Sequence, residues 1–527
     1  MSRINTNVPS MIAQRVLGLN NMAQQTSLER LSTGLRINRG KDDPAGLIAS
    51  QNLRSEMAGL SKAISNAERA DQVVNIAEGG LSEVSQLVIE LQRLITETAN
   101  TAGLSREERE ANQLQIDSIL QTIDRVASAT SFQGSKLLNG NLDYITSNVS
   151  ESVNQFRVNG AKLEFNGTQD VNVLVTGSAQ VGGFLLSFGS ANINLGGAGA
   201  ADGADSQFVI EIAGAQGARE LSFASGTSVA DMVSAINSFT NVTGVIASVS
   251  GTSGVRLVST EQGKDHFVSL RVINDGDIFD SAGIYNLSTN NINLADTSSV
   301  TAFSDAKNKL TDRGQDVRAV INGIVATTRG TTARINTDFL DVQIDLAYDP
   351  TSSDANAARL GLVEAFKITG GGADFQLASR VDINGRVAMG IGNIAVRELG
   401  RSDVTVNDTS GNKVSATYTL SDFTSGKALN AVDGNLDAAQ AVVERAIRDI
   451  STLRGRLGAF QSNIVGATSR SLGISLENTA SAESVIRDTD FANETSQLTR
   501  AQILAQSSLQ ALQFANTQPQ QALQLLG

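Results

Sequence analysis

The sequence predicts an α+β multidomain protein in which the paired N- and C-terminal segments form a long antiparallel helical coiled-coil rod around a β-rich insertion. Three observations support this prediction. Apolar residues at both ends follow a heptad stride, none of the 4 prolines interrupts a heptad stretch, and glycine is concentrated in the middle. Of the 48 glycines, 9 lie in residues 1–135 and 5 in residues 435–527. Because glycine in a helix interior costs roughly 1 kcal/mol, this distribution marks the two ends as helical.

The N-terminal part predicts three helices. The first is expected to extend to about residue 35. The second should begin at Pro44, which suits a first helical turn, and continue to about residue 100, a length of roughly 85 Å. Its apolar residues recur every seven positions at Leu53, Leu60, Ala67, Val74, Leu81, Val88 and Ile95. The third helix opens with the capping box Ser105-x-x-Glu108, and Gly134 lies beyond its end.

The middle of the chain reads as strands and turns. Runs rich in β-branched residues occur at 171–177, 208–214 and 245–250. Asn-Gly dipeptides, which favour tight hairpin turns, follow several such runs. They lie at 139–140, 159–160, 166–167, 322–323 and 384–385.

The C-terminal part predicts a second set of helices with a coiled-coil seam. Its alternating steps of three and four place the following residues on one side: Leu436, Ala439, Val443, Ala446, Ile450, Leu453, Leu457, Phe460, Ile464, Ala467, Ser471 and Ile474. In the last forty residues, Phe491, Leu498, Ala505 and Leu512 are likewise spaced seven residues apart. A matching stripe near the start comprises Val8, Ile12, Val16, Leu19, Ala23, Leu31 and Leu35. We expect both short stretches to order only against each other and against neighbouring subunits.

Composition excludes several function classes. The net charge of −13 argues against nucleic-acid binding, and no apolar run approaches the length of a membrane helix. No cleavable secretory signal is recognisable at the N-terminus, so export would need another route. The chain has no cysteine, and its single histidine, His266, cannot build a zinc site without carboxylate ligands. We therefore expect no catalytic residue, metal or cofactor.

The terminal segments resemble bacterial flagellin. The resemblance is carried by LERLSTGLRINRGKDDPAGLIASQNLRSE (28–56), IAEGGLSEVSQLVIELQRL (76–94), TIDRVASATSFQGSKLLNG (122–140) and the final stretch from Arg487 to Gly527. Residues 206–273 resemble a small module of hook-associated proteins, with Ser228 expected to cap its helix through Ile236.

The resemblance implies a structural subunit that self-assembles into the flagellar filament for swimming motility. It implies residues 1–44 with 486–527 as the coiled-coil filament core, residues 45–175 with 428–485 as a surrounding helical rod with a β-hairpin, and residues 176–427 as surface-exposed variable domains. Export would be through the flagellar type III apparatus without signal cleavage, which places the protein in the extracellular filament. The implied partners are copies of the chain, an export chaperone, the filament cap and hook-associated junction proteins, with no nucleic acid and no membrane.

Two residue sets follow. The expected assembly seam comprises Val8, Ile12, Leu19, Leu31, Leu35, Phe491, Leu498 and Leu512. The resemblance also marks Glu90, Leu94 and Gln115 as the face that a flagellin-sensing Toll-like receptor would contact. Flagellins that this receptor detects carry a basic residue where Glu90 aligns, so the reversed charge argues against recognition.

Two alternatives remain open at this point. A hook–filament junction protein shares the terminal helices, and seeded assembly would separate it from a filament subunit, because a junction protein stops elongation. An enzyme carried on a filament would need a metal or a nucleophile constellation that the sequence does not offer.

Overall fold

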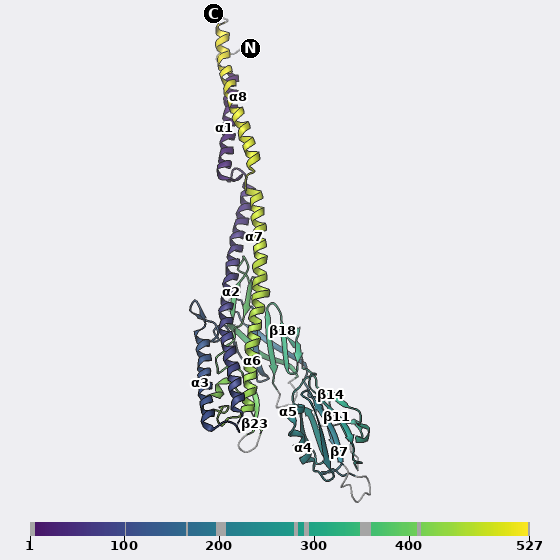
Figure 1. Ribbon diagram of the computed structural model, residues 1–527. Helices are drawn as coiled ribbons and strands as arrows, with labels where there is room; N and C mark the ends of the chain where they lie inside the picture. The colour runs from purple at the N-terminus through teal and green to yellow at the C-terminus, as the bar shows by residue number, and fades with distance from the viewer. Residues whose placement is uncertain are drawn as a thin grey trace. The chain divides into compact units, whose positions relative to one another are not determined.

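The computed structural model describes residues 6–100, 102–164, 167–195, 207–278, 283–288, 295–347, 360–407 and 413–524. The chain is mixed α and β, with helices in its terminal thirds and strands between them (Figure 1). The N-terminal helices are α1 (Val8–Thr33), α2 (Pro44–Thr98) and α3 (Arg106–Ala129). The C-terminal ones are α6 (Leu436–Ala459), the π-helical stretch η3 (Phe460–Val465), α7 (Gly466–Arg487) and α8 (Phe491–Gln524).

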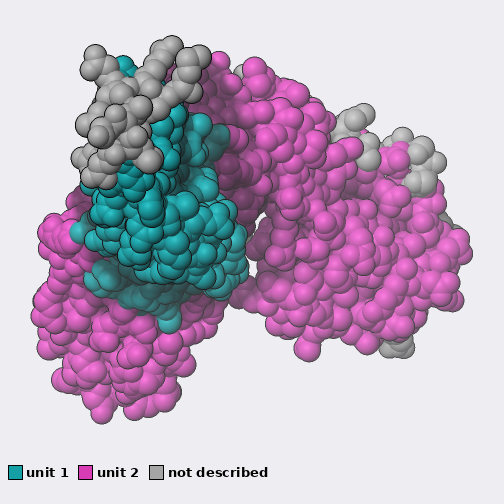
Figure 2. Space-filling model, turned by 90° about the horizontal axis from the view of Figure 1, so that it is seen from above, with its two compact units in different colours: residues 1–78, 375–386, 454–527 teal, residues 79–374, 387–453 magenta. Residues whose placement is uncertain are grey.

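The chain divides into two compact units, coloured separately in Figure 2. Unit 1 comprises residues 1–78, 375–386 and 454–527, and unit 2 comprises residues 79–374 and 387–453. Each unit therefore combines segments from both halves of the sequence.

The predicted heptad face of α2 is confirmed. From Leu60 to Ile95, every predicted position on this face is buried. On α6, the predicted seam is likewise buried from Ala439 to Phe460. The capping box of α3 also forms, because the Glu108 amide donates to the Ser105 hydroxyl and the Ser105 amide donates to the Glu108 carboxylate.

Beyond Phe460 the predicted seam is wrong. Ile464, Ala467, Ser471 and Ile474 are all exposed, and Val465 is buried in place of Ile464. The cause is η3, in which the Gly466 amide donates to the Gln461 carbonyl five residues back. This wide turn holds one more residue than an α-helical turn, so every later side chain shifts by one position around the helix.

The described strands of unit 2 surround two separate hydrophobic cores. The first lies between two antiparallel sheets, β16-β15-β5-β20-β3 and β17-β18-β19-β4, and is lined by Val173, Ile321, Val342 and Ile368 among others. Its strands are β3 (Tyr144–Ser147), β4 (Val153–Ala161), β5 (Gln169–Gly177), β15 (Arg318–Ile321), β16 (Ile324–Val325), β17 (Thr327–Arg329), β18 (Thr332–Asn336), β19 (Leu340–Leu346) and β20 (Gly361–Gly371). These strands lie on both sides of the expected boundary at residue 175.

The second core lies between the sheets β13-β12-β6-β10-β9 and β14-β11-β7-β8, with α4 (Val229–Asn237) and α5 (Thr240–Thr243). The strands are β6 (Gly183–Ser187), β7 (Gln207–Gly214), β8 (Ala218–Ala224), β9 (Val245–Ser250), β10 (Gly254–Ser259), β11 (Phe267–Asn274), β12 (Gly283–Leu287), β13 (Ala295–Thr301) and β14 (Leu310–Arg313). The short 3-10 helix η1 (Phe303–Asp305) lies between β13 and β14. The predicted cap of α4 forms, since the Asp231 amide donates to the Ser228 hydroxyl.

The remaining strands form short pairs. They are β1 (Ser131–Phe132) with β2 (Ser135–Lys136), β21 (Ala373–Gln376) with β22 (Arg386–Met389), and β23 (Ser402–Asn407) with β24 (Lys413–Tyr418), which precedes the 3-10 turn η2 (Leu420–Phe423). No helix in the described part of the chain is both long and apolar enough to cross a bilayer.

Candidate assembly surface

The candidate functional surface is formed by the terminal helices α1 and α8, which lie side by side in unit 1 (Figure 1). Asn7 caps α1 by accepting a hydrogen bond from the Ser10 amide, and Gly34 ends the helix in the left-handed conformation at φ 73°. Asp490 caps the start of α8 by accepting from the amides of Ala492 and Asn493. Each helix thus has side-chain or backbone signals that fix its boundaries.

The seam between α1 and α8 consists mainly of small and polar residues, with a few half-buried leucines among them. Ser10 donates from its hydroxyl to Asn516 Oδ1 at 2.7 Å, and the Asn20 amide donates to the Ser508 hydroxyl at 2.8 Å. Farther along, the Arg30 guanidinium lies 3.6 Å from the Glu494 carboxylate. On α1 the seam follows a heptad stride through Ser10, Ala13, Leu17, Asn20, Gln24, Ser27 and Leu31; on α8 it runs through Glu494, Leu498, Ala501, Ala505, Ser508, Leu512 and Ala515.

Backbone contacts close the base of this helix pair. The Arg36 amide donates to the Arg487 carbonyl at 2.7 Å, and the Thr489 amide donates to the Gly34 carbonyl at 2.9 Å. Leu35 and Asp488 form an isolated β-bridge between the two segments. The turn after α1 is thereby fastened to the turn before α8.

Most of the large apolar side chains of both helices are exposed outside this seam. Ile12 is 50% exposed and Phe514 is 73% exposed. The other exposed apolar side chains of the pair include Val8, Met11, Val16, Leu19, Met22, Leu28, Phe491, Ile503, Leu504 and Leu509. A groove of about 660 Å³ lies between the helices, with Pro9, Ile12, Val16, Ala511 and Phe514 in its lining. We call these exposed side chains and the groove the apolar face.

The structure divides the expected assembly seam between these two surfaces. Val8, Ile12, Leu19 and Phe491 are exposed on the apolar face, whereas Leu31, Leu498 and Leu512 are half-buried in the seam between α1 and α8. Leu35 lies in the bridge at the base. The sequence placed Ser508 beside the C-terminal stripe but did not indicate the polar seam residues Ser10 and Asn20 of α1. The signal for them was a second heptad stride of small residues on α1.

The three residues of the expected receptor face lie in unit 2 but not all at the surface. Glu90 and Arg93 form an ion pair of 2.6 Å on α2, and the hydrogen bond from Arg93 lowers the pKa of the Glu90 carboxyl. Gln115 is exposed on α3, whereas Leu94 is buried. The exposed part of this set is therefore a polar one.

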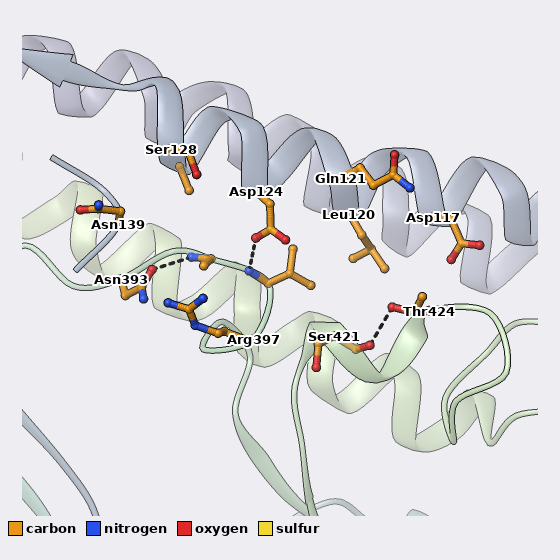
Figure 3. A pocket seen from close by; sticks show the side chains of 13 residues that line it. Asp117, Leu120, Gln121, Asp124, Ser128, Asn139, Asn393, Arg397, Ser421 and Thr424 are labelled. Atoms are coloured by element: carbon orange, nitrogen blue, oxygen red, sulfur yellow. Dashed lines mark hydrogen bonds between the residues drawn. The ribbon is translucent and has the colours of Figure 1, made fainter. Parts of the chain in front are cut away.

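A polar cleft of about 580 Å³ lies beside α3 (Figure 3). Its carboxylates serve as caps for neighbouring loops: Asp124 accepts from the Val396 amide at 2.9 Å, and Asp117 accepts from the Ser425 amide at 3.1 Å. Asn393 and Thr424 also bond to backbone groups of these loops. The polar side chains of the cleft therefore serve to hold the neighbouring loops, and no nucleophile is paired with a base among its lining residues.

The described residues hold no group of three or more His, Asp or Glu side chains that could bind a metal ion. His266 Nε2 lies 3.2 Å from the Glu261 carboxylate, so the imidazole contacts a single carboxylate in this pair.

Comparisons with known proteins point in one direction. Residues 4–143 match the bacterial flagellin N-terminal helical region, residues 440–526 match the bacterial flagellin C-terminal helical region, and residues 207–261 match the flagellin hook IN motif. Flagellin A of Helicobacter pylori is 27% identical over 99% of both chains. Flagellin D of Vibrio anguillarum is 28% identical, again over 99% of both chains.

Among solved structures, the D2–D3 domains of the flagellar cap protein from Serratia marcescens are 20% identical, with a TM-score of 0.23 over 39% of this chain and 98% of that one. FliC from Burkholderia pseudomallei is 12% identical, with a TM-score of 0.22 over 75% of this chain and 99% of that one.

Proposed function

We propose a mode of assembly for this chain, which belongs to the bacterial flagellin family and is a flagellar filament subunit. In this proposal, the apolar face of α1 and α8 packs against neighbouring copies of the chain. The observation that supports this is the arrangement of the helix pair: small and polar residues occupy most of its seam, while Ile12, Val16 and Phe514 line an open groove. Large apolar surfaces that are exposed to solvent mark protein interaction sites.

The energetics favour a second copy as the occupant. Burying a side chain such as Ile12 or Phe514 contributes about 1.5–3 kcal/mol, so covering the apolar face outweighs what the polar seam supplies within one chain. A polymer repeats each such contact in every subunit. The terminal helices therefore gain most of their stability on assembly.

We extend this proposal to the layers of the filament. Residues 1–44 and 486–527 form the core, residues 45–175 and 428–485 surround it, and residues 176–427 face outward and carry the hook-type module at 206–273. The family assignment and the apolar face on the first and last helices support this order. In this arrangement the chain is an extracellular structural protein that serves swimming motility and performs no catalysis.

Export and partners follow from the same family. We propose that the chain leaves the cell unfolded through the flagellar type III apparatus, accompanied by an export chaperone, and adds beneath the filament cap to a filament that starts on hook-associated junction proteins. The absence of cysteine suits this route, because no disulfide can form before or during passage.

The proposal is tested by a charge on the apolar face. Phe514→Asp places a carboxylate where a neighbouring copy would bury it, at a cost of several kcal/mol per contact. Gln513→Asp places the same charge on the exposed side of α8 that lies away from the groove, and serves as the matched control. Seeded elongation, followed by electron microscopy, should stop with the first variant and proceed with the second.

Two results would contradict the proposal. Filaments of normal length from Phe514→Asp protein would show that this face stays in solvent. Wild-type protein that binds seeds and then blocks their growth would instead indicate a hook–filament junction protein.

A further inference from the structure

The π-helical stretch η3 gives α7 two possible packed sides. From Ala439 to Phe460 the helix buries one heptad seam. After η3, Val465 is buried, and a half-buried stripe continues one residue later through Leu472, Leu476, Thr479, Glu483 and Ile486. The stripe that an uninterrupted α-helix would have buried contains Ile464 and Ile474, and it now faces solvent. Ile474 is 61% exposed.

Both stripes are apolar enough to serve as a seam. The stripe on the inner side offers the buried Val465 and the half-buried Leu472 and Ile486, whereas the exposed stripe offers Ile464, Ala467 and Ile474. One residue of an α-helix corresponds to a rotation of about 100° and a rise of 1.5 Å. Loss of the wide turn would therefore rotate α7 and exchange the two stripes without breaking the helix.

Contacts within unit 1 hold the wide turn in the observed register. The Gln461 amide donates to Asp71 Oδ1 at 2.7 Å and to Asn75 Oδ1 at 3.0 Å. The Phe460 ring packs against the ring of Phe375, with centroids 5.5 Å apart. The hydrogen bonds of Gln461 join exposed or half-buried groups, and the ring contact joins the buried Phe460 to the half-buried Phe375, so the register rests on a small number of interactions at the start of η3.

Gly466 favours the wide turn. A Cβ atom at this position would lie 3.3 Å from the Gln461 carbonyl oxygen, which is the acceptor of the π-type hydrogen bond. In an ordinary α-helix, alanine is preferred over glycine. The residue type at position 466 therefore affects the equilibrium between the π-helical and the α-helical turn.

We propose that η3 is a register switch for α7, in which a π-helical turn presents the stripe of Ile464 and Ile474 to the surroundings and an α-helical turn presents the stripe of Val465 and Leu472. Two packings of one helix that differ by few contacts make such an element bistable. The switch decides which apolar stripe α7 offers outside its own chain.

The chain has no cysteine, so single introduced thiols report the register. Ile474→Cys and Leu472→Cys are made separately, and their rates of reaction with a water-soluble maleimide are compared in monomeric protein. Gly466→Ala is then added to each, with Gly458→Ala as the matched control, since a Cβ atom at Gly458 meets nothing within 4 Å. Both changes raise helix propensity, but only the first crowds the π-type bond.

In the parent protein, the thiol at 474 should react faster than the thiol at 472. Gly466→Ala should lower the ratio of these rates about fivefold or more, the factor that corresponds to the glycine-to-alanine preference in helices. Gly458→Ala should leave the ratio unchanged. An unchanged ratio with Gly466→Ala would overturn the proposal, and so would equal acceleration at both positions, which would mean that α7 opens instead of rotating.

Deletion of Ser462 provides a second test. It removes the extra residue of the wide turn and keeps the later residues on their present sides, so in this background Gly466→Ala should no longer alter the ratio. If Gly466→Ala still lowered the ratio there, the effect would not come from η3 and the switch would be excluded.

Discussion

Glu211 illustrates how single charged residues hold the second core together. It lies on β7, where its carboxylate accepts a hydrogen bond from Lys309 Nζ at 2.7 Å and also pairs with Arg271 on β11. Hydrogen bonding from Lys309 and the charge of Arg271 keep the pKa of the Glu211 carboxyl below its ordinary value of 4.5. The side chain is 16% exposed, so these contacts are only partly screened by solvent.

The sign of this pKa shift predicts an acid-sensitive contribution. A carboxyl whose pKa is lowered in the folded state stabilises the protein above its unfolded-state pKa, and this stability is lost as the pH falls through the lower folded value. Glu211→Gln should therefore reduce the free energy of unfolding by about 1–2 kcal/mol at pH 7. Chemical denaturation at pH 7 and pH 3 measures this; the difference should shrink at the lower pH.

Glu220→Gln is the matched control, because Glu220 lies opposite Glu211 on β8 and is exposed. A loss of stability that is equal for both variants, or independent of pH, would mean that the ion pairs of Glu211 contribute nothing specific.

Single residues also show where sequence reasoning stops. Asn322-Gly323 forms the predicted tight turn between β15 and β16, with φ values of 47° and 83°. Asn159-Gly160 was expected to turn in the same way, yet it lies inside β4, where the pairing with β19 shifts register at Asp341 and Val342. The Asn159 amide there donates to the Asp341 carboxylate. An Asn-Gly dipeptide can therefore lie in a β-bulge as well as in a tight turn, and the pairing with the partner strand determines which of these structures forms.

At the scale of elements, the heptad periodicity of α2 and α6 was sufficient to predict which side of each helix is buried, because their seams are apolar and uninterrupted. The break at η3 is marked only by Gly466, and because Gly458 and Gly473 lie inside unbroken helix, the sequence favoured the stripe of Ile464 and Ile474. The terminal helices show a second kind of limit. α1 has two heptad strides, one apolar and one of small and polar residues, and a single chain cannot tell which of them meets α8 and which meets another copy.

The polar seam predicts that the terminal helices are weakly held in the monomer. With Ser10, Asn20 and Ser508 between them, α1 and α8 leave most of their large apolar side chains unpacked, and most of the stability of a helix in a protein comes from packing its apolar side. Hydrogen–deuterium exchange of monomeric protein should show amides of α1 and α8 exchanging at least about a hundredfold faster than those around Val74 in α2, whose side chain is fully buried. Comparable protection in both regions would refute this expectation.

At the scale of the whole molecule, the inserted region consists of two parts that depend differently on the rest of the chain. The second core is drawn entirely from residues 184–306. The chain enters and leaves this module side by side, because the Gln180 and Gln315 backbones bond to each other at 2.8 and 2.9 Å. The first core instead combines strands β3 to β5 with β15 to β20, so it includes residues on both sides of the boundary that the sequence suggested.

This difference predicts the outcome of two deletions. Removing residues 181–314 and joining Gln180 to Gln315 through two glycines should give a folded chain that still polymerises, because no strand of the first core is lost. Removing residues 176–427 would take away β15, β19 and β20, the partners of β4 and β5, and should yield an aggregated or protease-sensitive protein. Limited proteolysis and seeded assembly of both variants measure this, and equal behaviour of the two would contradict the assignment of the cores.

The central claim is that the apolar face of α1 and α8 is the contact between copies of the chain. A cryo-electron microscopy map of the assembled filament at side-chain resolution tests it most directly. If this face is the contact, Ile12, Val16 and Phe514 will be buried against residues of neighbouring subunits, while Ser10 and Ser508 remain in the seam within one chain. A map in which these three apolar side chains face solvent, or in which α1 and α8 of one chain are separated, would contradict it.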